Sequence, residues 1–180
     1  MDALSNMYNK LVQLIAIALL SFTLYSSNTV ADEASLMEPL TYQQWLNKLQ
    51  TKQPNIVVVD MWAMWCVSCL ERFPEMVEMH KRYKSDDVVF VSMNLDDRDD
   101  KESIEAADKF LRSMNAEFDH YRMDENLMLA FEKTNLMSIP AVLIYDREGS
   151  ERFRLTGDNP NRQFSKYDIE QAIQSLLHNQ

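Results

Sequence analysis

Apolar residues change their spacing several times along the chain, and each change predicts a new element of secondary structure. Two runs, residues 56–59 and 88–91, are apolar at every position, which is typical of strands buried on both faces. Between them, from Cys66 to Met79, apolar residues recur every three or four positions, as on the buried side of a helix. Two buried strands joined by a helix predict a parallel pair with a right-handed crossover.

The remainder of the chain after residue 36 follows the same two periods. Helical spacing covers residues 41–49, with Thr41 as the N-cap, and residues 101–114, 127–131 and 167–177. Strand patterns cover residues 118–123, 141–145 and 151–156, and a turn at residues 146–149 predicts that the last two form an antiparallel hairpin. Residues 85–87 are also turn-like. From residue 56 the order β-α-β-α-β-α-β-β-α predicts an α/β domain with helices on both faces of a central sheet.

The first 31 residues have a different pattern. Residues 11–20 are apolar except for Gln13, and this character continues to Tyr25 before the chain turns polar. A core of about 15 residues is short for a bilayer span but typical of a signal peptide, with Lys10 before it and a small-residue cleavage site at Ala31. We expect residues 1–31 to be a cleaved leader, with a retained membrane anchor as the alternative, and residues 32–180 to form one domain.

Composition narrows the function classes. The 180 residues include two glycines and five prolines, which favours a compact domain over a linker-rich or disordered chain. The net charge of −10 repels phosphate backbones, so we expect no nucleic-acid partner. The charged run at residues 96–102 lacks the glycine and final glutamate of a calcium loop, and it predicts a solvated helix start.

Both cysteines lie at the junction of the first buried strand and the following helix. A helix N-terminus offers unpaired N–H groups and the positive end of the helix dipole, which favour a thiolate at Cys66. Cys69, three residues later, lies on the same face of the first turn and can attack a mixed disulfide formed on Cys66. The spacing predicts a redox dithiol in which Cys66 is the nucleophile and Cys69 the resolving thiol.

Metal sites are the main alternative for this pair. A structural zinc ion needs four ligands, and the other candidate ligands, His80, His120 and His178, are far apart in the sequence. A copper site is possible because soft sulfur ligands are close in sequence: Met61, Met64, Met76 and Met79. Spacing favours core positions for Met61, Met76 and Met79, and a surface position on the helix for His80. We therefore expect no metal.

The segment VVVDMWAMWCVSC, residues 57–69, resembles the active-site segment of the thioredoxin superfamily, with its buried strand, acid, Trp-Ala-x-Trp and dithiol. Pro74 falls where that family kinks its active-site helix, and Ile139 and Pro140 resemble its cis-proline pair. Gly149 and Gly157 match two glycines near the end of the family's domain. The resemblance implies a thioredoxin-like α/β fold with a central mixed sheet flanked by helices.

Residues 99–126 resemble the helix-strand insertion before the cis-proline in the TlpA/ResA-like branch of that superfamily. Its members are exported thiol-disulfide oxidoreductases of bacterial envelopes that often serve cytochrome c maturation. Val67 and Ser68 depart from the commoner Gly-Pro between the cysteines, and the branch-typical proline before Cys69 is missing. These two residues are expected to tune the reduction potential, which follows thiolate stability at this turn.

The resemblance also implies roles for residues around the dithiol. Asp60 ends an apolar strand, where burial should raise its proton affinity and let it take the proton from Cys69, although a strand-end aspartate can also simply face solvent. Ile139, next to a cis Pro140, would pair with an extended substrate segment. Trp65 would cover the sulfur of Cys66 and contact substrate. Trp62 is expected in the core.

The sequence therefore predicts an exported, periplasmic or extracytoplasmic thiol-disulfide oxidoreductase that acts chiefly as a reductant. The Cys66–Cys69 couple carries the electrons, so we expect no organic cofactor. Expected partners are disulfide-containing envelope proteins and a membrane or thiol electron donor. Two alternatives stay open, a copper or metal chaperone and a non-enzymatic peptide-binding module. Whether the protein is a reductant, an oxidant or an isomerase depends on its reduction potential.

Overall fold

The structure, a computed structural model, describes residues 7, 34–84, 87–158 and 161–178. The chain divides into two units, Met1–Ala34 and Ser35–Gln180. Apart from Met7, the expected leader or anchor lies outside the described residues, as do Ser85 and Asp86 of the predicted turn. Across the described ranges, no helix combines the length and the apolar character needed to cross a bilayer.

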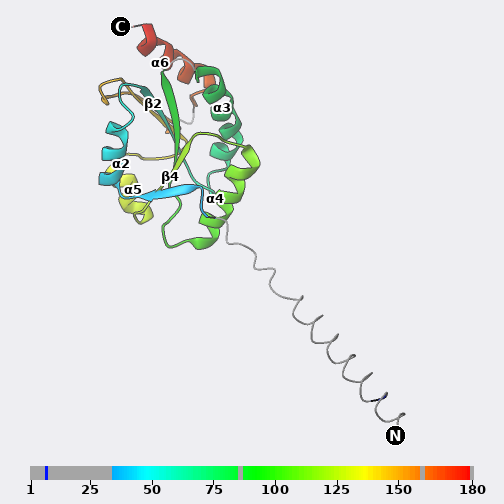
Figure 1. The fold of residues 1–180 in the computed structure, drawn as a ribbon. Coiled ribbons are helices and arrows are strands. Elements are labelled where there is room, and N and C mark those ends of the chain that lie inside the picture. The colour runs from blue at the N-terminus through cyan, green and yellow to red at the C-terminus, as the bar shows by residue number, and fades with distance from the viewer. Residues whose placement is uncertain (1–6, 8–33, 85–86, 159–160, 179–180) are drawn as a thin grey trace. The chain divides into compact units, whose positions relative to one another are not determined.

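A six-stranded sheet forms the centre of the second unit (Figure 1). Its spatial order is β1 (Met37–Leu40), β4 (Asp119–Met123), β3 (Val88–Asn94), β2 (Ile56–Trp62), β5 (Ala141–Tyr145) and β6 (Glu151–Thr156). The first four strands are mutually parallel, whereas β5 runs antiparallel to β2 and β6 antiparallel to β5. The predicted parallel pair, the hairpin and the mixed central sheet are confirmed.

Helices cover both faces of this sheet, as Figure 1 shows. On one face lie α3 (Val67–Tyr83), α4 (Lys101–Met114) and α6 (Lys166–His178), whose apolar side chains enclose Phe73 and Phe90. On the other face lie α2 (Tyr42–Gln50) and α5 (Leu127–Thr134), which pack around Trp45 and Val59. Two apolar clusters, one on each face, therefore fix β2 and β3 at the centre of the domain.

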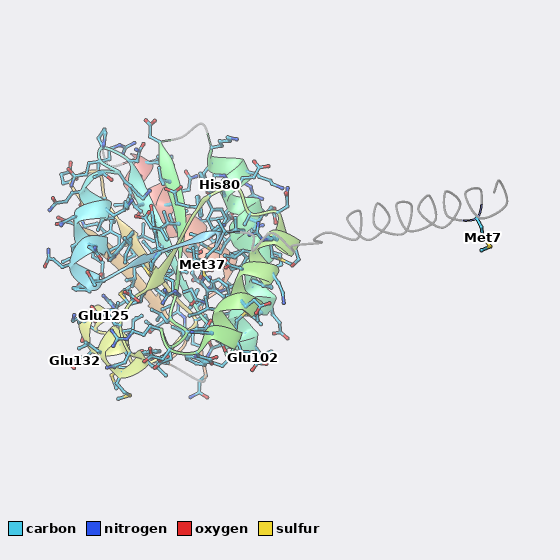
Figure 2. The ribbon with its side chains drawn as sticks, turned by 60° about the horizontal axis from the view of Figure 1, so that its bottom comes forward. Met7, Met37, His80, Glu102, Glu125 and Glu132 are labelled. Atoms are coloured by element: carbon cyan, nitrogen blue, oxygen red, sulfur yellow. A yellow bond between two sulfur atoms is a disulfide. The ribbon has the colours of Figure 1, made fainter. Side chains whose placement is uncertain are left out.

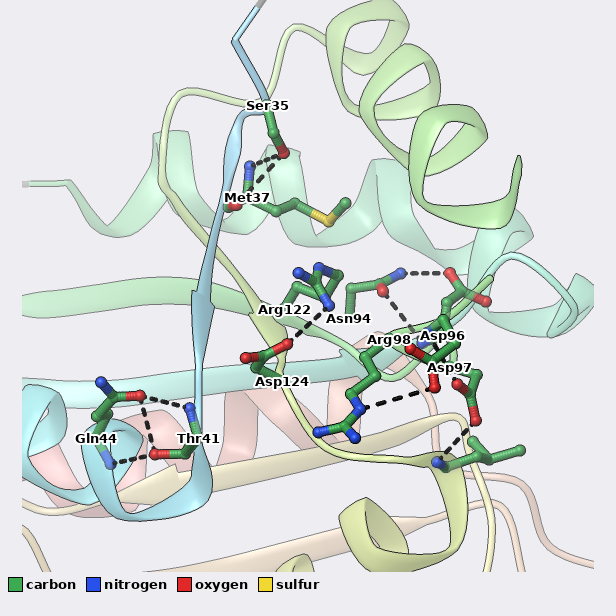
Figure 3. Close-up of polar contacts among 12 residues, drawn as sticks. Ser35, Met37, Thr41, Gln44, Asn94, Asp96, Asp97, Arg98, Arg122 and Asp124 are labelled. Carbon is green, nitrogen blue, oxygen red and sulfur yellow. Dashed lines mark hydrogen bonds and ion pairs between the residues drawn. The ribbon is translucent and has the colours of Figure 1, made fainter. Parts of the chain in front are cut away.

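The strand β1 is not predicted by the sequence pattern. It has four residues, of which only Met37 and Leu40 are buried, so neither strand nor helix periodicity shows in it. It pairs with β4 at the edge of the sheet, where the missing N–H of Pro39 is tolerated. Thr41 follows and caps α2 in a reciprocal capping box with Gln44, as predicted for this N-cap (Figure 3).

The stretch from residue 99 to 126 holds α4 and β4, which are the predicted helix and strand. Asp100 caps α4 by accepting a hydrogen bond from the backbone N–H of Ser103 at 3.0 Å, so the charged run does begin a helix. Asp96, in the same run, is only 2% exposed. The prediction of a solvated segment is therefore wrong for that residue.

His80, which the pattern places on the surface of the helix, is only partly exposed. Its ring packs against Phe118 and Phe90, with centroid separations of 5.3 and 6.1 Å, on the side of the sheet covered by α3 (Figure 2). Its Nδ1 atom is buried and has no hydrogen-bond partner among the described residues. His80 lies four residues after the buried Met76, so it shares the sheet-facing side of the helix. Burial lowers its pKa.

Candidate active site

The dithiol lies at the junction between the end of β2 and the start of α3. Cys66 is the N-cap of α3 and forms a disulfide with Cys69, with sulfur atoms 2.06 Å and Cα atoms 5.3 Å apart. Cys66 is 6% exposed and Cys69 is fully buried. An incoming reactant therefore meets the sulfur of Cys66 first, while Cys69 stays behind it in the apolar cluster beneath α3.

Two groups of the first helical turn surround the sulfur of Cys66. The backbone N–H of Cys69 donates to this sulfur at 3.3 Å, and the hydroxyl oxygen of Ser68 lies 3.7 Å from it. The N-terminal end of α3 adds the positive end of the helix dipole. These groups favour a negative charge on Cys66 after reduction, which is the chemistry that a nucleophilic thiolate needs.

A loop at the end of β3 holds the turn that carries the dithiol. The backbone N–H of Met64 donates to both carboxylate oxygens of Asp96 at 3.0 Å. The side-chain amide of Asn94 donates to Asp96 Oδ2 at 2.7 Å (Figure 3). The backbone N–H of Leu95 also donates to the carbonyl of Trp62 at 2.7 Å. Burial raises the pKa of Asp96, and the hydrogen bonds from Asn94 and Met64 oppose that rise. Sequence reasoning missed this residue.

Asp60 lies within β2, is fully buried, and faces α3, as do Val58 and Trp62 on the same side of the strand. Its Oδ1 atom accepts a hydrogen bond from the guanidinium of Arg72 on α3. Burial raises the pKa of Asp60, and the positive charge of Arg72 opposes the rise. The solvent-facing alternative for Asp60 is wrong. The sequence analysis does not identify Arg72 as a site residue, although its position three residues after Cys69 places both on one side of α3.

An apolar surface borders the disulfide. Trp65 and Val67, on either side of Cys66, are 52% and 67% exposed. The ring of Trp65 lies 6.4 Å from that of Phe131 on α5, and Met128 of the same helix is exposed. Trp62 is fully buried, as predicted. Trp65 therefore offers an aromatic face to solvent next to the reactive sulfur.

Ile139 and Pro140 precede β5, whose Ala141 lies opposite Met61 near the end of β2 that leads to the dithiol. The Ile139–Pro140 peptide bond is cis, and Ile139 is partly buried against both apolar clusters. Gly157 donates its backbone N–H to the carbonyl of Pro140 at 3.0 Å. An added Cβ at Gly157 would lie 3.1 Å from Gln163 Oε1 and 3.3 Å from Pro140 Cδ, so the chain packs tightly at this position.

The methionines near the dithiol in sequence do not gather around it. Met61 packs on the face covered by α2 and α5, whereas Met76 and Met79 pack with the two cysteines on the opposite face. The prediction that these three fill the core is confirmed, and Met64 is partly buried. In the described part of the chain, no three His, Cys, Asp or Glu residues come together as metal ligands would.

Residues 54–151 match a protein-family model described as thioredoxin-like. Among solved structures, a protein described as the thiol:disulfide interchange protein DsbE from Chlorobium tepidum is 28% identical, with a TM-score of 0.58 over 72% of this chain and 84% of its own. A thiol-disulfide isomerase from Corynebacterium glutamicum is 18% identical, with a TM-score of 0.60 over 73% and 86% of the two chains.

A third solved structure is a secreted disulfide oxidoreductase from Mycobacterium tuberculosis, which is 21% identical with a TM-score of 0.54 over 71% of this chain and 86% of its own. At their levels of identity, the Corynebacterium and Mycobacterium structures show a shared fold alone. No curated protein matches the sequence.

Proposed function

Since this chain belongs to the thioredoxin-like family and is a thioredoxin-fold thiol-disulfide oxidoreductase, we propose that it is an exported reductant of disulfides in other envelope proteins. The observation that carries this proposal is the pair of unequal sulfurs at the start of α3. Cys66 keeps a small exposed fraction of 6% and lies beside two groups that can donate to its sulfur, whereas Cys69 is fully buried. This arrangement suits a thiol that attacks and a second that resolves.

In the proposed reaction the reduced protein binds a substrate disulfide, and the Cys66 thiolate attacks one of its sulfurs. The substrate S–S bond breaks, one substrate thiolate leaves, and a mixed disulfide remains on Cys66. Asp60 takes the proton from Cys69, whose sulfur then bonds to that of Cys66 and displaces the second substrate thiolate. Two electrons pass to the substrate, the proton follows from Asp60 through solvent, and the Cys66–Cys69 disulfide re-forms.

The substrate docks on the surface next to the sulfur of Cys66. Trp65 supplies an exposed aromatic ring, and the backbone before Pro140 lies near the same end of β2. We propose that an extended segment around the substrate cysteine contacts both, as in strand addition. Val67 and Ser68, which lie between the cysteines, tune the stability of the Cys66 thiolate and thereby the reduction potential.

The proposed partners follow from this chemistry. Disulfide-containing envelope proteins are the substrates, with cytochrome c precursors as the specific class that the TlpA/ResA-like resemblance suggests. A membrane or thiol donor must return two electrons to the Cys66–Cys69 disulfide after each turnover. Export is supported by the signal-like pattern of residues 1–31.

An equilibrium titration of the full chain against glutathione, read by alkylation of the free thiols, tests the direction of transfer. A reductant should have a potential near about −270 mV, whereas an oxidant would lie near about −120 mV. The same preparation should reduce insulin disulfides catalytically, and Cys66→Ser should abolish this turnover. If the wild-type protein shows no turnover, the proposed function is wrong.

A further inference from the structure

The buried ion pair between β2 and α3 extends the site beyond the dithiol. The Asp60 side chain is fully buried and that of Arg72 is only 10% exposed, so both charges are removed from water. Separating such a pair leaves an uncompensated charge in an apolar surrounding, which is far more costly than losing a surface ion pair. Arg72 lies nearly one helical turn after Cys69, so the two residues share one side of α3.

Only one oxygen of the Asp60 carboxylate is used in this pair. Oδ1 accepts from Arg72, whereas Oδ2 is buried and has no hydrogen-bond partner among the described residues. A buried oxygen without a partner is costly, and such atoms in native structures call for an explanation. A proton donor that exists only in another redox state provides one, because the Cys69 thiol carries its proton only after the disulfide is reduced.

Neighbouring side chains hold Arg72 in place. Its guanidinium carbon lies 4.8 Å from the centre of the Phe164 ring, and one of its nitrogens lies 3.8 Å from the sulfur of Met76. The Phe164 ring comes from the segment before α6 and covers the guanidinium plane as in a cation–π contact. The pair is thus enclosed between the sheet, α3 and this segment.

Other groups on this face contribute little charge near Asp60. From α3 the charged group that acts on Asp60 is Arg72, and on β5 the apolar Val142 lies opposite Asp60. From β3 comes Ser92, whose hydroxyl lies 2.8 Å from Nδ1 of His120 on β4. Burial lowers the pKa of His120, which keeps its ring neutral at neutral pH. Arg72 is therefore the cation that acts on Asp60.

We propose that Arg72 is a positioning residue of the exchange reaction, which keeps Asp60 as a carboxylate, fixes Oδ1, and leaves Oδ2 to accept the proton of Cys69. This inference rests on the proposed function. The step is a proton transfer from the Cys69 thiol to Asp60, followed by bond formation between the two cysteine sulfurs and departure of the substrate sulfur as a thiolate. Without Arg72, a carboxyl group this deeply buried binds a proton from solvent and can no longer act as the base.

The resolving step can be followed directly with a chromogenic aryl disulfide. The reduced protein releases one aryl thiolate when Cys66 attacks and a second when Cys69 resolves, and the rate of the second phase is measured from pH 5 to 9. In wild-type protein this rate should fall on the acidic side as Asp60 becomes protonated. In Arg72→Met this acidic limb should move to higher pH by about one unit or more. At a fixed pH on the limb, the second phase of the variant should then be about tenfold slower than that of wild-type protein.

Matched variants separate this role from a structural one. Arg72→Lys keeps the charge and should leave the limb near its wild-type position. Arg82→Met removes an arginine of the same helix whose ion pairs with Glu78 and Glu170 are on the surface, and it should leave the limb unmoved. In an Asp60→Asn background, Arg72→Met should no longer shift the second phase. A shift of the same size in that background would overturn the proposal, as would an unmoved limb in Arg72→Met.

Folding of each variant is checked by circular dichroism and urea unfolding. If Arg72→Met does not fold, Arg72→Gln decides, since it removes the charge, keeps a hydrogen-bond donor to Asp60, and should shift the limb in the same direction by a smaller amount. An unmoved limb in Arg72→Gln then overturns the proposal. Absence of the first phase in wild-type protein would instead refute the proposed function itself, so the two failures are distinguishable.

Discussion

The backbone nitrogen of Met64 lies 3.0 Å from each carboxylate oxygen of Asp96, which ties the end of β3 to the turn that carries the dithiol. The next residue, Asp97, accepts a hydrogen bond at 3.1 Å from the backbone N–H of Leu127, the first residue of α5 (Figure 3). One short loop therefore supports both the reactive turn and the helix that packs beside Trp65.

Asp96→Ala should weaken this support. The substitution leaves the partly buried N–H of Met64 and the buried amide of Asn94 without their acceptor, so we expect the free energy of unfolding to fall by about 1–3 kcal/mol. Insulin reduction should also slow, because the turn that presents Cys66 is no longer fixed. Urea unfolding of the oxidised protein and a turbidity assay measure the two effects.

Asp99→Ala is the matched control for that experiment, because the side chain of Asp99 is 84% exposed and makes only a 3.8 Å ion pair with Arg98. Its effect on the free energy of unfolding should stay within about 0.5 kcal/mol. Equal losses in the two variants would show that the contact with Met64 has no special role.

Ser68→Ala should make the protein a slightly stronger reductant. The hydroxyl 3.7 Å from the sulfur of Cys66 can donate to a thiolate there, so its removal destabilises the charged reduced form. A rise of about half a unit in the pKa of Cys66 corresponds to a potential about 15 mV more negative. Thiolate absorbance against pH and the glutathione equilibrium measure the two shifts. Ser68→Thr keeps the hydroxyl and should match the wild type, and an unchanged Ser68→Ala would exclude this role.

Trp65→Ala should affect protein substrates more than small ones. The ring is half exposed, so we expect the free energy of unfolding to change by less than about 1 kcal/mol. The KM for insulin in the disulfide-reduction assay should rise several-fold, while the rate of reduction of glutathione disulfide should hardly change. Tyr167→Ala removes another exposed aromatic ring, on α6, and serves as the control. Similar losses with both substrates would argue against a docking role for Trp65.

His80→Leu should make the protein less sensitive to acid. Burial lowers the pKa of His80 below its usual 6.5, so the unfolded chain binds a proton before the folded protein does as the pH falls. Stability that is fully present above pH 6.5 is thus lost as the pH falls toward the folded pKa. Urea unfolding at pH 7.5 and 5.5 should show a smaller drop in His80→Leu than in wild type. His178→Gln, at the exposed end of α6, should reproduce the wild-type drop, and an unchanged drop in His80→Leu would contradict the expected effect.

Much of the fold is predictable from the sequence because its central elements carry unambiguous periods. The apolar run at residues 56–59 becomes β2, and helical spacing from Cys66 becomes α3. The strand β1 is not predicted because its four residues, which include Pro39, show neither the alternation of a strand nor the spacing of a helix in their apolar positions. Only pairing with β4 makes them a strand. The spatial order of the strands likewise depends on contacts between distant segments.

The candidate site shows the same division. Local chemistry predicts the two cysteines, since a strand, a helix start and their spacing are adjacent in the sequence. Arg72 and Asp96 escape prediction because a charged residue on a helix or in a charged run normally faces solvent. Their burial arises from partners on other elements, namely Asp60 on β2 and Met64 after it, which only the folded chain brings within reach.

The two aspartates at the end of β3 also bear on how this protein can diversify. Asp96 anchors the reactive turn, and Asp97 anchors the start of α5, where Met128 is exposed and Phe131 lies beside Trp65. A deletion or insertion in this loop would change sulfur reactivity and partner preference together. New partner preference at constant reactivity must therefore arise from side-chain replacements on α5 itself, which makes that helix the place to begin in redesigning the enzyme.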